Sequence, residues 1–120
     1  EWNAHRRKVA SWYEELLTNE KMIKPKVSSY CGEHTYHIYC VRLIDLDRDK
    51  VMKILNDNGS QCGIHYPIPI EETTIYKDHG WVNENTREYA KQLLSLPMHP
   101  FMTRDDVVKV TDILNNFQQR

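Results

Sequence analysis

Hydrophobic residues near the start of the chain recur at the spacing of one helical face. They are Val9, Trp12, Tyr13, Leu16 and Leu17. Their positions follow the i, i+3, i+4, i+7, i+8 rule, which predicts an amphipathic helix. The chain begins without methionine and without a clear loop before this helix, so we expect a piece of a longer protein, cut within or beside a longer helix. After the helix the periodicity stops, and residues 18–32 are predicted to form a connecting loop.

Between residues 35 and 44 the pattern changes from helical to β. This stretch is rich in β-branched and aromatic residues with few polar interruptions, which predicts a central rather than an edge strand. A helix capped by Asp45 or Asp47 should follow, and Asn58-Gly59 supplies its left-handed stop. Its predicted buried stripe consists of Val51, Ile54 and Leu55.

The second half of the chain alternates again. Residues 60–66 end at a proline and are predicted to form a second strand. Residues 70–81 are irregular, and a helix over residues 86–94 is followed by a short strand over residues 95–98.

A capping box formed by Thr103 and Asp106 marks the start of a closing helix. The stripe of that helix consists of Val107, Val110, Ile113, Leu114 and Phe117. The order of elements is therefore α-β-α-β-α-β-α, which indicates an α/β (α+β) fold. We expect a small sheet of about three strands covered by helices, in a single domain over residues 1–120.

Charge and composition narrow the class of protein. The formal net charge is -1, so no basic excess points to nucleic acid or anionic lipid as a partner. No apolar run approaches the roughly 18 residues that span a bilayer. Three cysteines are an odd number, which favours free thiols in a reducing compartment and hence a cytoplasmic protein.

Two cysteine-containing patterns suggest chemistry, and the predicted strands argue against both. Four residues could ligate zinc: Cys31, His34, His37 and Cys40. Side chains alternate faces in a strand, so His37 and Cys40 should point apart, and a buried Cys40 with a hydrogen-bonded His37 is favoured over a metal site. Cys62 and His65 are separated by the same odd spacing, and no glycine-rich elbow accompanies them, which disfavours a nucleophilic cysteine.

His65 and Tyr66 are the strongest candidates for ligand contact. Imidazole and phenol can each donate or accept a hydrogen bond, and both residues lie where the second predicted strand ends. The two prolines that follow, Pro67 and Pro69, also fit a rigid turn packed against the core. The residues alone leave these two interpretations equally open.

Four motifs together resemble a known family. They are Trp2-Asn3 with Arg6-Arg7, Ala10 and Tyr13; Tyr36-His37-Ile38-Tyr39-Cys40-Val41-Arg42; Gly63-Ile64-His65-Tyr66-Pro67-Ile68-Pro69; and Leu94-Ser95-Leu96-Pro97-Met98. In this order and spacing they are similar to the C-terminal domain of DegT/DnrJ/EryC1/StrS sugar aminotransferases. The resemblance implies the small domain of a fold-type I enzyme that depends on pyridoxal phosphate. Such enzymes are typically homodimers that transfer an amino group from glutamate to a nucleotide-linked keto-sugar.

The resemblance also implies roles for three residues. His65 and Tyr66 would contact the substrate on its sugar side. Arg42 would hold the carboxylate of the amino donor, or else be paired structurally within the central strand. The family often has a histidine where this chain has Glu71 and Glu72, and carboxylates there would repel a diphosphate.

The sequence also departs from the family by what it lacks. No segment resembles the family's Schiff-base lysine, the acidic partner of the pyridine nitrogen or a phosphate cradle. We therefore expect no catalytic, cofactor-binding or metal-binding residue, and a domain that is inactive alone and joined to a large cofactor-binding domain of the same chain. The alternative is a free-standing binding or regulatory module with the same fold.

Overall fold

The computed structural model describes residues 1–30 and 32–118. The described residues form four α-helices, three strands and two short 3-10 helices. In chain order these are α1 (Trp2–Leu16), β1 (Met22–Ile23), β2 (Tyr39–Leu43), α2 (Arg48–Asp57), η1 (Ile70–Glu72), η2 (Lys77–His79), α3 (Glu84–Gln92), β3 (Leu93–Leu96) and α4 (Arg104–Asn115). The α/β fold class predicted from the sequence is confirmed.

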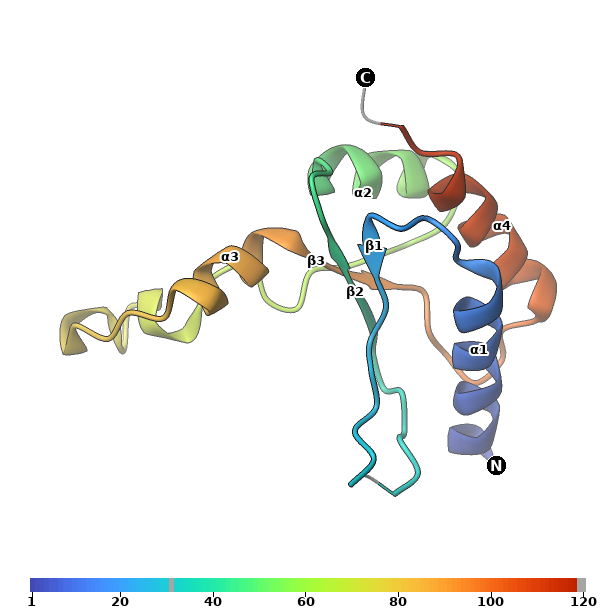
Figure 1. Ribbon diagram of the computed structural model, residues 1–120, viewed down its shortest axis with the longest axis horizontal. Helices are drawn as coiled ribbons and strands as arrows, with labels where there is room; N and C mark the ends of the chain where they lie inside the picture. Colours follow the sequence, from blue (N-terminus) through green and yellow to red (C-terminus); the bar gives the residue numbers. More distant parts are fainter. Residues whose placement is uncertain (31, 119–120) are drawn as a thin grey trace.

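The three strands form one antiparallel sheet with β2 in the middle (Figure 1). Met22 of β1 lies opposite Leu43 of β2, while on the other side Tyr39 lies opposite Leu96 and Arg42 opposite Leu93. The prediction of a central strand is confirmed, although the strand covers Tyr39–Leu43 rather than the whole of residues 35–44.

Alternation along β2 separates the two faces of the sheet. Tyr39, Val41 and Leu43 are buried, whereas Cys40 and Arg42 are half-buried. The buried face packs against α1, α2 and α4, which contribute Val9, Ala10, Tyr13, Val51, Leu55, Val107, Val110 and Leu114 to the core. Figure 1 shows α1 and α4 side by side next to this sheet. We call this the core face and the opposite one the outer face.

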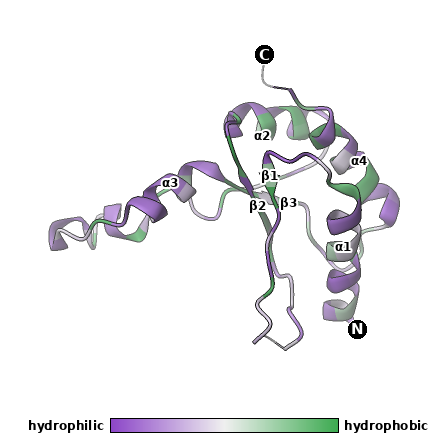
Figure 2. Ribbon diagram, in the orientation of Figure 1, coloured by the Kyte–Doolittle hydropathy of each residue, from purple (hydrophilic) through white to green (hydrophobic). Residues whose placement is uncertain are grey.

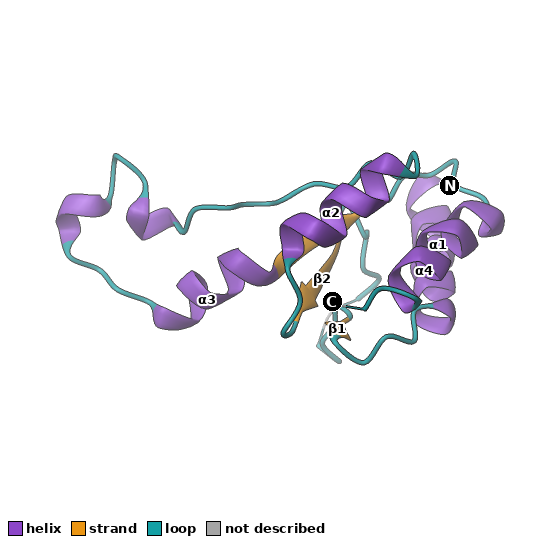
Figure 3. Cartoon of the chain, turned by 90° about the horizontal axis from the view of Figure 1, so that it is seen from above, coloured by secondary structure: helices purple, strands orange, loops and turns teal. Residues whose placement is uncertain are grey.

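Residues 67–92 project from the sheet as an arm (Figures 1 and 3). The arm contains η1, η2 and α3, and it rejoins the body where α3 passes directly into β3. Figure 2 shows hydrophobic and hydrophilic segments alternating along it. Several of its large apolar side chains are exposed: Ile68, Ile70, Ile75, Trp81, Val82 and Tyr89.

Helix ends agree closely with the capping residues read from the sequence. The Asp47 carboxylate accepts hydrogen bonds from the backbone N–H groups of Asp49 and Lys50 at the start of α2. After α2 the chain turns at Gly59, whose φ of 76° lies in the left-handed region that favours glycine. Thr103 and Asp106 form the predicted capping box of α4.

Three predicted elements are wrong or shifted, and the strand predicted over residues 95–98 lies at Leu93–Leu96. The predicted loop over residues 18–32 contains β1, a two-residue strand too short to carry a periodic signal. The predicted strand over residues 60–66 is reduced to a single bridge between Gly63 and Ser95. The predicted helix over residues 86–94 ends at Gln92, and Leu93 begins β3.

Phe117, assigned to the stripe of the closing helix, lies beyond the end of α4 and is only partly buried. One position of the predicted α2 stripe is also wrong. Ile54, assigned to the buried stripe of α2, is 38% exposed, while Val51 and Leu55 are fully buried. The i, i+4 pair faces the core, and Ile54 lies at the edge of that stripe, where the helix meets solvent.

Candidate functional site

Gly63 connects the segment that follows α2 to the sheet. Its backbone N–H donates to the Ser95 carbonyl at 3.0 Å, and the Ser95 N–H donates to the Gly63 carbonyl at 2.8 Å. This reciprocal pair lays the segment against β3 at Ser95, which is 5% exposed. The His-Tyr pair that follows Gly63 is thereby held beside the outer face.

His65 is fixed by one side chain of β3. Its Nδ1 lies 2.9 Å from Ser95 Oγ, while the residue as a whole is exposed. The imidazole helps to line a pocket of about 300 Å³ together with Cys62 and Met98. One nitrogen of the His65 ring is therefore hydrogen-bonded to the sheet, and the ring lines this small pocket.

Tyr66 belongs to a different hollow. It is 74% exposed and meets the His65 ring edge to face at 5.6 Å, across a cis peptide bond. It lines an apolar groove of about 640 Å³ with Ile68 of the arm, Tyr89 of α3 and Leu93. The structure thus brings the two predicted substrate residues together, but each lines a separate pocket.

Arg42 lies on the same outer face, one step along the sheet. It is half-buried, and its guanidinium carbon lies 4.3 Å from the centroid of the Tyr89 ring. Ser95 pairs with Cys40 and Leu93 with Arg42, so these four residues share the outer face. Arg42 contacts the arm rather than His65 or Tyr66.

The two described cysteines are not activated. Burial raises the pKa of both the Cys40 and the Cys62 thiol, which disfavours the thiolate that a nucleophile requires. Cys62 Sγ lies 3.9 Å from the Met52 carbonyl and 3.8 Å from Asn56 Oδ1, while His65 bonds to Ser95. The sequence-suggested cysteine-histidine pair does not form.

The described residues of the zinc-like pattern have separate surroundings. Cys31 lies outside the described residues. His34 Nδ1 accepts the backbone N–H of Tyr36 at 3.0 Å, and His37 is exposed. Cys40, predicted to be buried, is half-buried. Within residues 1–30 and 32–118, no three His, Cys, Asp or Glu side chains are grouped as metal ligands.

Glu71 and Glu72 occupy very different surroundings. Glu72 pairs with Arg87 of α3 at 2.7 Å on the arm. Glu71 is only 7% exposed, and one of its carboxylate oxygens has no hydrogen-bond partner among the described residues. The Glu71 carboxylate is thus buried, whereas that of Glu72 lies at the surface.

The family model described as the DegT/DnrJ/EryC1/StrS aminotransferase family matches residues 1–115. The chain belongs to this family. Its members are aminotransferases that use pyridoxal phosphate, and one structural neighbour, a Streptococcus pneumoniae protein, was solved in its PLP-form (TM-score 0.79, 18% identity).

Relatives in the DegT/DnrJ/EryC1/StrS family match nearly all of this chain. A dTDP-3-amino-3,6-dideoxy-alpha-D-galactopyranose transaminase of Aneurinibacillus thermoaerophilus is 29% identical over 118 residues, which are 96% of this chain and 31% of the relative. A UDP-N-acetyl-3-dehydro-alpha-D-glucosamine 3-aminotransferase of Acidithiobacillus ferrooxidans is 26% identical over 94% of this chain and 30% of its own length. The chain therefore spans about a third of these relatives.

Solved structures share the fold. A DegT DnrJ EryC1 StrS aminotransferase from Brucella abortus superimposes with a TM-score of 0.84 at 23% identity, over 99% of this chain and 32% of that one. DesV of S. venezuelae, solved with a ketimine intermediate, gives 0.83 at 24% identity over 95% and 31%. The arrangement of sheet, core helices and arm is thus one that aminotransferases of this family contain.

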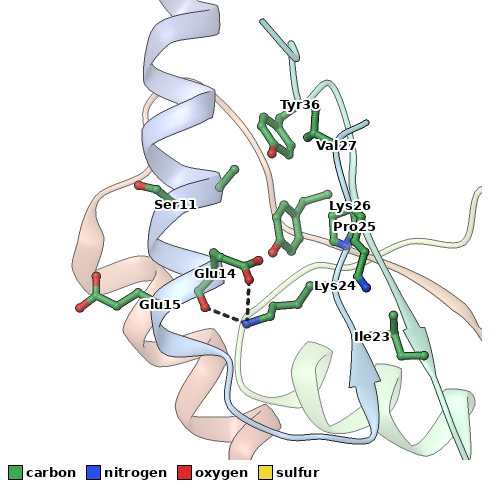
Figure 4. A pocket seen from close by; sticks show the side chains of 11 residues that line it. Ser11, Glu14, Glu15, Ile23, Lys24, Pro25, Lys26, Val27 and Tyr36 are labelled. Carbon is green, nitrogen blue, oxygen red and sulfur yellow. Dashed lines mark hydrogen bonds and ion pairs between the residues drawn. The ribbon is translucent and has the colours of Figure 1, made fainter. Parts of the chain in front are cut away.

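The lysines do not fit the family cofactor. Pyridoxal phosphate requires a lysine whose amine is free to form an imine. Lys24 is half-buried beside a cavity of about 790 Å³ (Figure 4), but its Nζ donates to the Glu14 and Leu17 carbonyls at 2.7 and 3.1 Å and pairs with the Glu14 carboxylate at 3.3 Å. Its three hydrogens are therefore engaged. The other lysines of the chain are all exposed.

Sequence reasoning missed two residues of this site. Ser95 appears in the sequence only as part of a short strand, and Tyr89 only as a member of a helical stripe. Their contacts with His65 and Arg42 join residues 30 and 47 positions apart. Only the occurrence of Ser95 and His65 in two motifs of one family could have suggested a link.

No helix among the described residues is long and apolar enough to cross a membrane.

Proposed function

We propose that this chain is the C-terminal, substrate-side domain of a pyridoxal-phosphate-dependent nucleotide-sugar aminotransferase, forming one domain over residues 1–120. The observation that carries the proposal is the family match over residues 1–115 in a chain that spans about 31% of a relative. The cofactor lysine would come from the rest of the longer protein, which we call the parent, because no lysine here is suited to that role. The chain alone would be inactive.

We infer that the parent uses glutamate as amino donor and a nucleotide-linked keto-sugar as acceptor. The names of two relatives, which refer to dTDP- and UDP-linked sugars, support the class of acceptor. The choice of glutamate follows from the family resemblance. No step of the transfer itself is assigned to residues of this chain.

The roles that we assign to this chain are binding and orientation. His65 has one ring nitrogen held by Ser95, which leaves Nε2 to bond a hydroxyl or carbonyl of the sugar. Tyr66 would offer its exposed phenol on the adjoining side. Arg42 could hold the donor carboxylate, since a guanidinium that lies over an aromatic ring can still direct N–H groups in its own plane.

We further infer a homodimeric parent in the cytoplasm. The arm exposes Ile75 and Trp81 at 77% and 59%, and large apolar side chains concentrated on a projection are typical of a surface that another part of an assembly covers. Free thiols at Cys40 and Cys62 support a reducing compartment.

Kinetics of the parent test the assignment of the site. His65→Ala and Tyr66→Phe should each lower turnover with a keto-sugar acceptor while leaving the fold unchanged by circular dichroism. Tyr30→Phe is the matched control, because Tyr30 is 97% exposed and lines none of the hollows described above. Unchanged kinetics in both site variants would remove these residues from the substrate site.

A titration of the isolated chain with pyridoxal phosphate tests whether it lacks the lysine that binds the cofactor. Addition of pyridoxal phosphate should produce no specific imine absorbance, since Lys24 is engaged and the remaining lysines are exposed. A stoichiometric adduct at one lysine would contradict the proposal and favour a free-standing module that binds the cofactor itself.

A further inference from the structure

Two segments distant in the sequence, residues 63–65 and β3, meet at the His65 ring, and Ser95 makes three hydrogen bonds between them. Its backbone pairs reciprocally with Gly63 at 2.8 and 3.0 Å, and its hydroxyl lies 2.9 Å from His65 Nδ1. Ser95 therefore holds both the strand-like segment and the ring that this segment carries.

We propose that Ser95 is the positioning residue for His65, fixing the imidazole so that Nε2 is its ligand-binding atom. This inference rests on the proposed function, in which His65 contacts the sugar. Ser95 would act through His65 and need not touch the substrate itself.

Burial makes this hydrogen bond an effective constraint. Ser95 is only 5% exposed, so water competes poorly for its hydroxyl, whose other hydrogen-bond neighbour is the Cys40 thiol. His65 itself is exposed, so without Ser95 its ring would be free to rotate. Nε2, the nitrogen that does not contact Ser95, is the one available to a ligand.

Gly63 supplies the space that this geometry needs. A Cβ atom built on Gly63 would lie 3.1 Å from His65 Cε1 and 3.8 Å from both ring nitrogens. The backbone of Gly63 is not in the left-handed region, so glycine is required here for close approach and not for its φ angle. A side chain at position 63 would therefore push the ring by a few tenths of an ångström from its place beside Ser95.

Nuclear magnetic resonance of the 120-residue chain tests the positioning directly. With ¹⁵N-labelled histidine, the shift of His65 Nδ1 should report its hydrogen bond to the Ser95 hydroxyl. Ser95→Ala should move the ring shifts toward the averaged values of a solvent-exposed histidine, and Ser95→Thr, which retains the hydroxyl, should restore them. Identical His65 ring shifts in the wild type and in Ser95→Ala would overturn the proposal.

Substitutions of two glycines test the same positioning of His65 while leaving the Ser95 hydroxyl in place. Gly63→Ala should displace the ring and produce the same change of shifts, because the added methyl group meets Cε1. Gly32→Ala is the matched control, since a Cβ at Gly32 meets nothing within 4 Å. If Gly63→Ala keeps the amide spectrum of the folded chain and the wild-type ring shifts, the proposal is wrong.

Kinetics of the parent then separate this inference from the proposed function. Ser95→Ala should lower kcat/KM for the keto-sugar roughly three- to tenfold, the range expected for one hydrogen bond of ordinary strength, and Ser95→Thr should recover most of it. Altered ring shifts with unchanged kinetics would leave Ser95 as the positioning residue but refute a substrate role for His65. Lost activity with unaltered ring shifts would refute the positioning and leave the substrate role standing.

Discussion

Tyr13 and Tyr39 form a stacked pair in the core whose hydroxyl groups are in opposite situations. Their ring centroids lie 4.7 Å apart at an interplanar angle of 24°, and neither residue is more than 1% exposed. The Tyr13 hydroxyl donates to the Pro97 carbonyl at 2.8 Å. The Tyr39 hydroxyl has no hydrogen-bond partner among residues 1–30 and 32–118. The same change, tyrosine to phenylalanine, should therefore have different effects at the two positions.

The sizes of the effects follow from these environments. Tyr13→Phe leaves the Pro97 carbonyl unpaired, which should lower the free energy of unfolding by about 1–2 kcal/mol. Tyr39→Phe removes a polar group that folding desolvates without compensation, so the free energy should stay constant or rise by up to about 1 kcal/mol. With a urea m-value of about 2 kcal/mol per M, the midpoint should fall by roughly 0.5–1 M for Tyr13→Phe only.

Urea unfolding of the 120-residue chain, followed by tryptophan fluorescence and far-ultraviolet circular dichroism, measures both variants. Tyr30→Phe serves as the control because Tyr30 is 97% exposed, and its midpoint should remain within the small range of surface substitutions. Equal losses for Tyr13→Phe and Tyr39→Phe would refute the reasoning, because they would mean that the Tyr39 hydroxyl is as well satisfied as that of Tyr13.

Three further predictions concern charge and capping. Burial raises the pKa of both Tyr13 and Tyr39. Because tyrosine in the unfolded chain ionises near pH 10, the folded state binds more protons than the unfolded state above that pH. The free energy of unfolding should therefore fall as the pH rises from about 10. Absorbance titration should show two of the seven tyrosines ionising late, and simultaneous ionisation of all seven would contradict this. Thr103→Ala removes the capping box of α4 and should cost about 1 kcal/mol in urea unfolding, whereas a cost near zero would show that the cap is dispensable. A double-mutant cycle of Arg42→Met and Tyr89→Leu should give a coupling free energy of about 0.5–1 kcal/mol if the guanidinium lies over the ring in solution, and additive effects would argue against that contact.

The parts of the fold that could be predicted from the sequence are those specified by local signals. Helices α1, α2 and α4 each carry a 3.6-residue stripe, and α2 and α4 also carry a cap whose partners lie within three residues. Both kinds of signal act within one helix and need no tertiary partner. The central strand was also predictable from a local signal. Because it is buried on the core face and half-buried on the outer face, it is rich in β-branched and aromatic residues.

The elements that failed depend on contacts across the fold. β1 has only two residues, Met22 and Ile23, and exists because they pair with Leu43 and Arg42. The segment over residues 60–66 has the composition of a strand, yet only Gly63 finds a partner, at Ser95. Leu93 continues the helical periodicity of α3 but is drawn into β3 by pairing with Arg42. Pairing partners of this kind are not encoded in a local window.

The candidate site divides in the same way. His65 and Tyr66 were predictable because a His-Tyr pair before two prolines is a local pattern. Their separation into two pockets was not predictable from the sequence. It depends on the hydrogen bond between Ser95 and the His65 ring and on α3, which lines the groove beside Tyr66. Arg42 was recognised as a candidate, but its contact with Tyr89 depends on how the arm returns to the sheet.

The alternation of β2 separates the two faces of the sheet, to which we assign different tasks. Tyr39, Val41 and Leu43 face the core and set stability, whereas Arg42 and its neighbour Ser95 on β3 face outward toward the residues assigned to ligand binding. A one-residue slip of register would exchange the faces and lose both properties together. The buried phenol of Tyr39 and the tethered imidazole of His65 are therefore best tested by different readouts, unfolding for the first and ring shifts for the second.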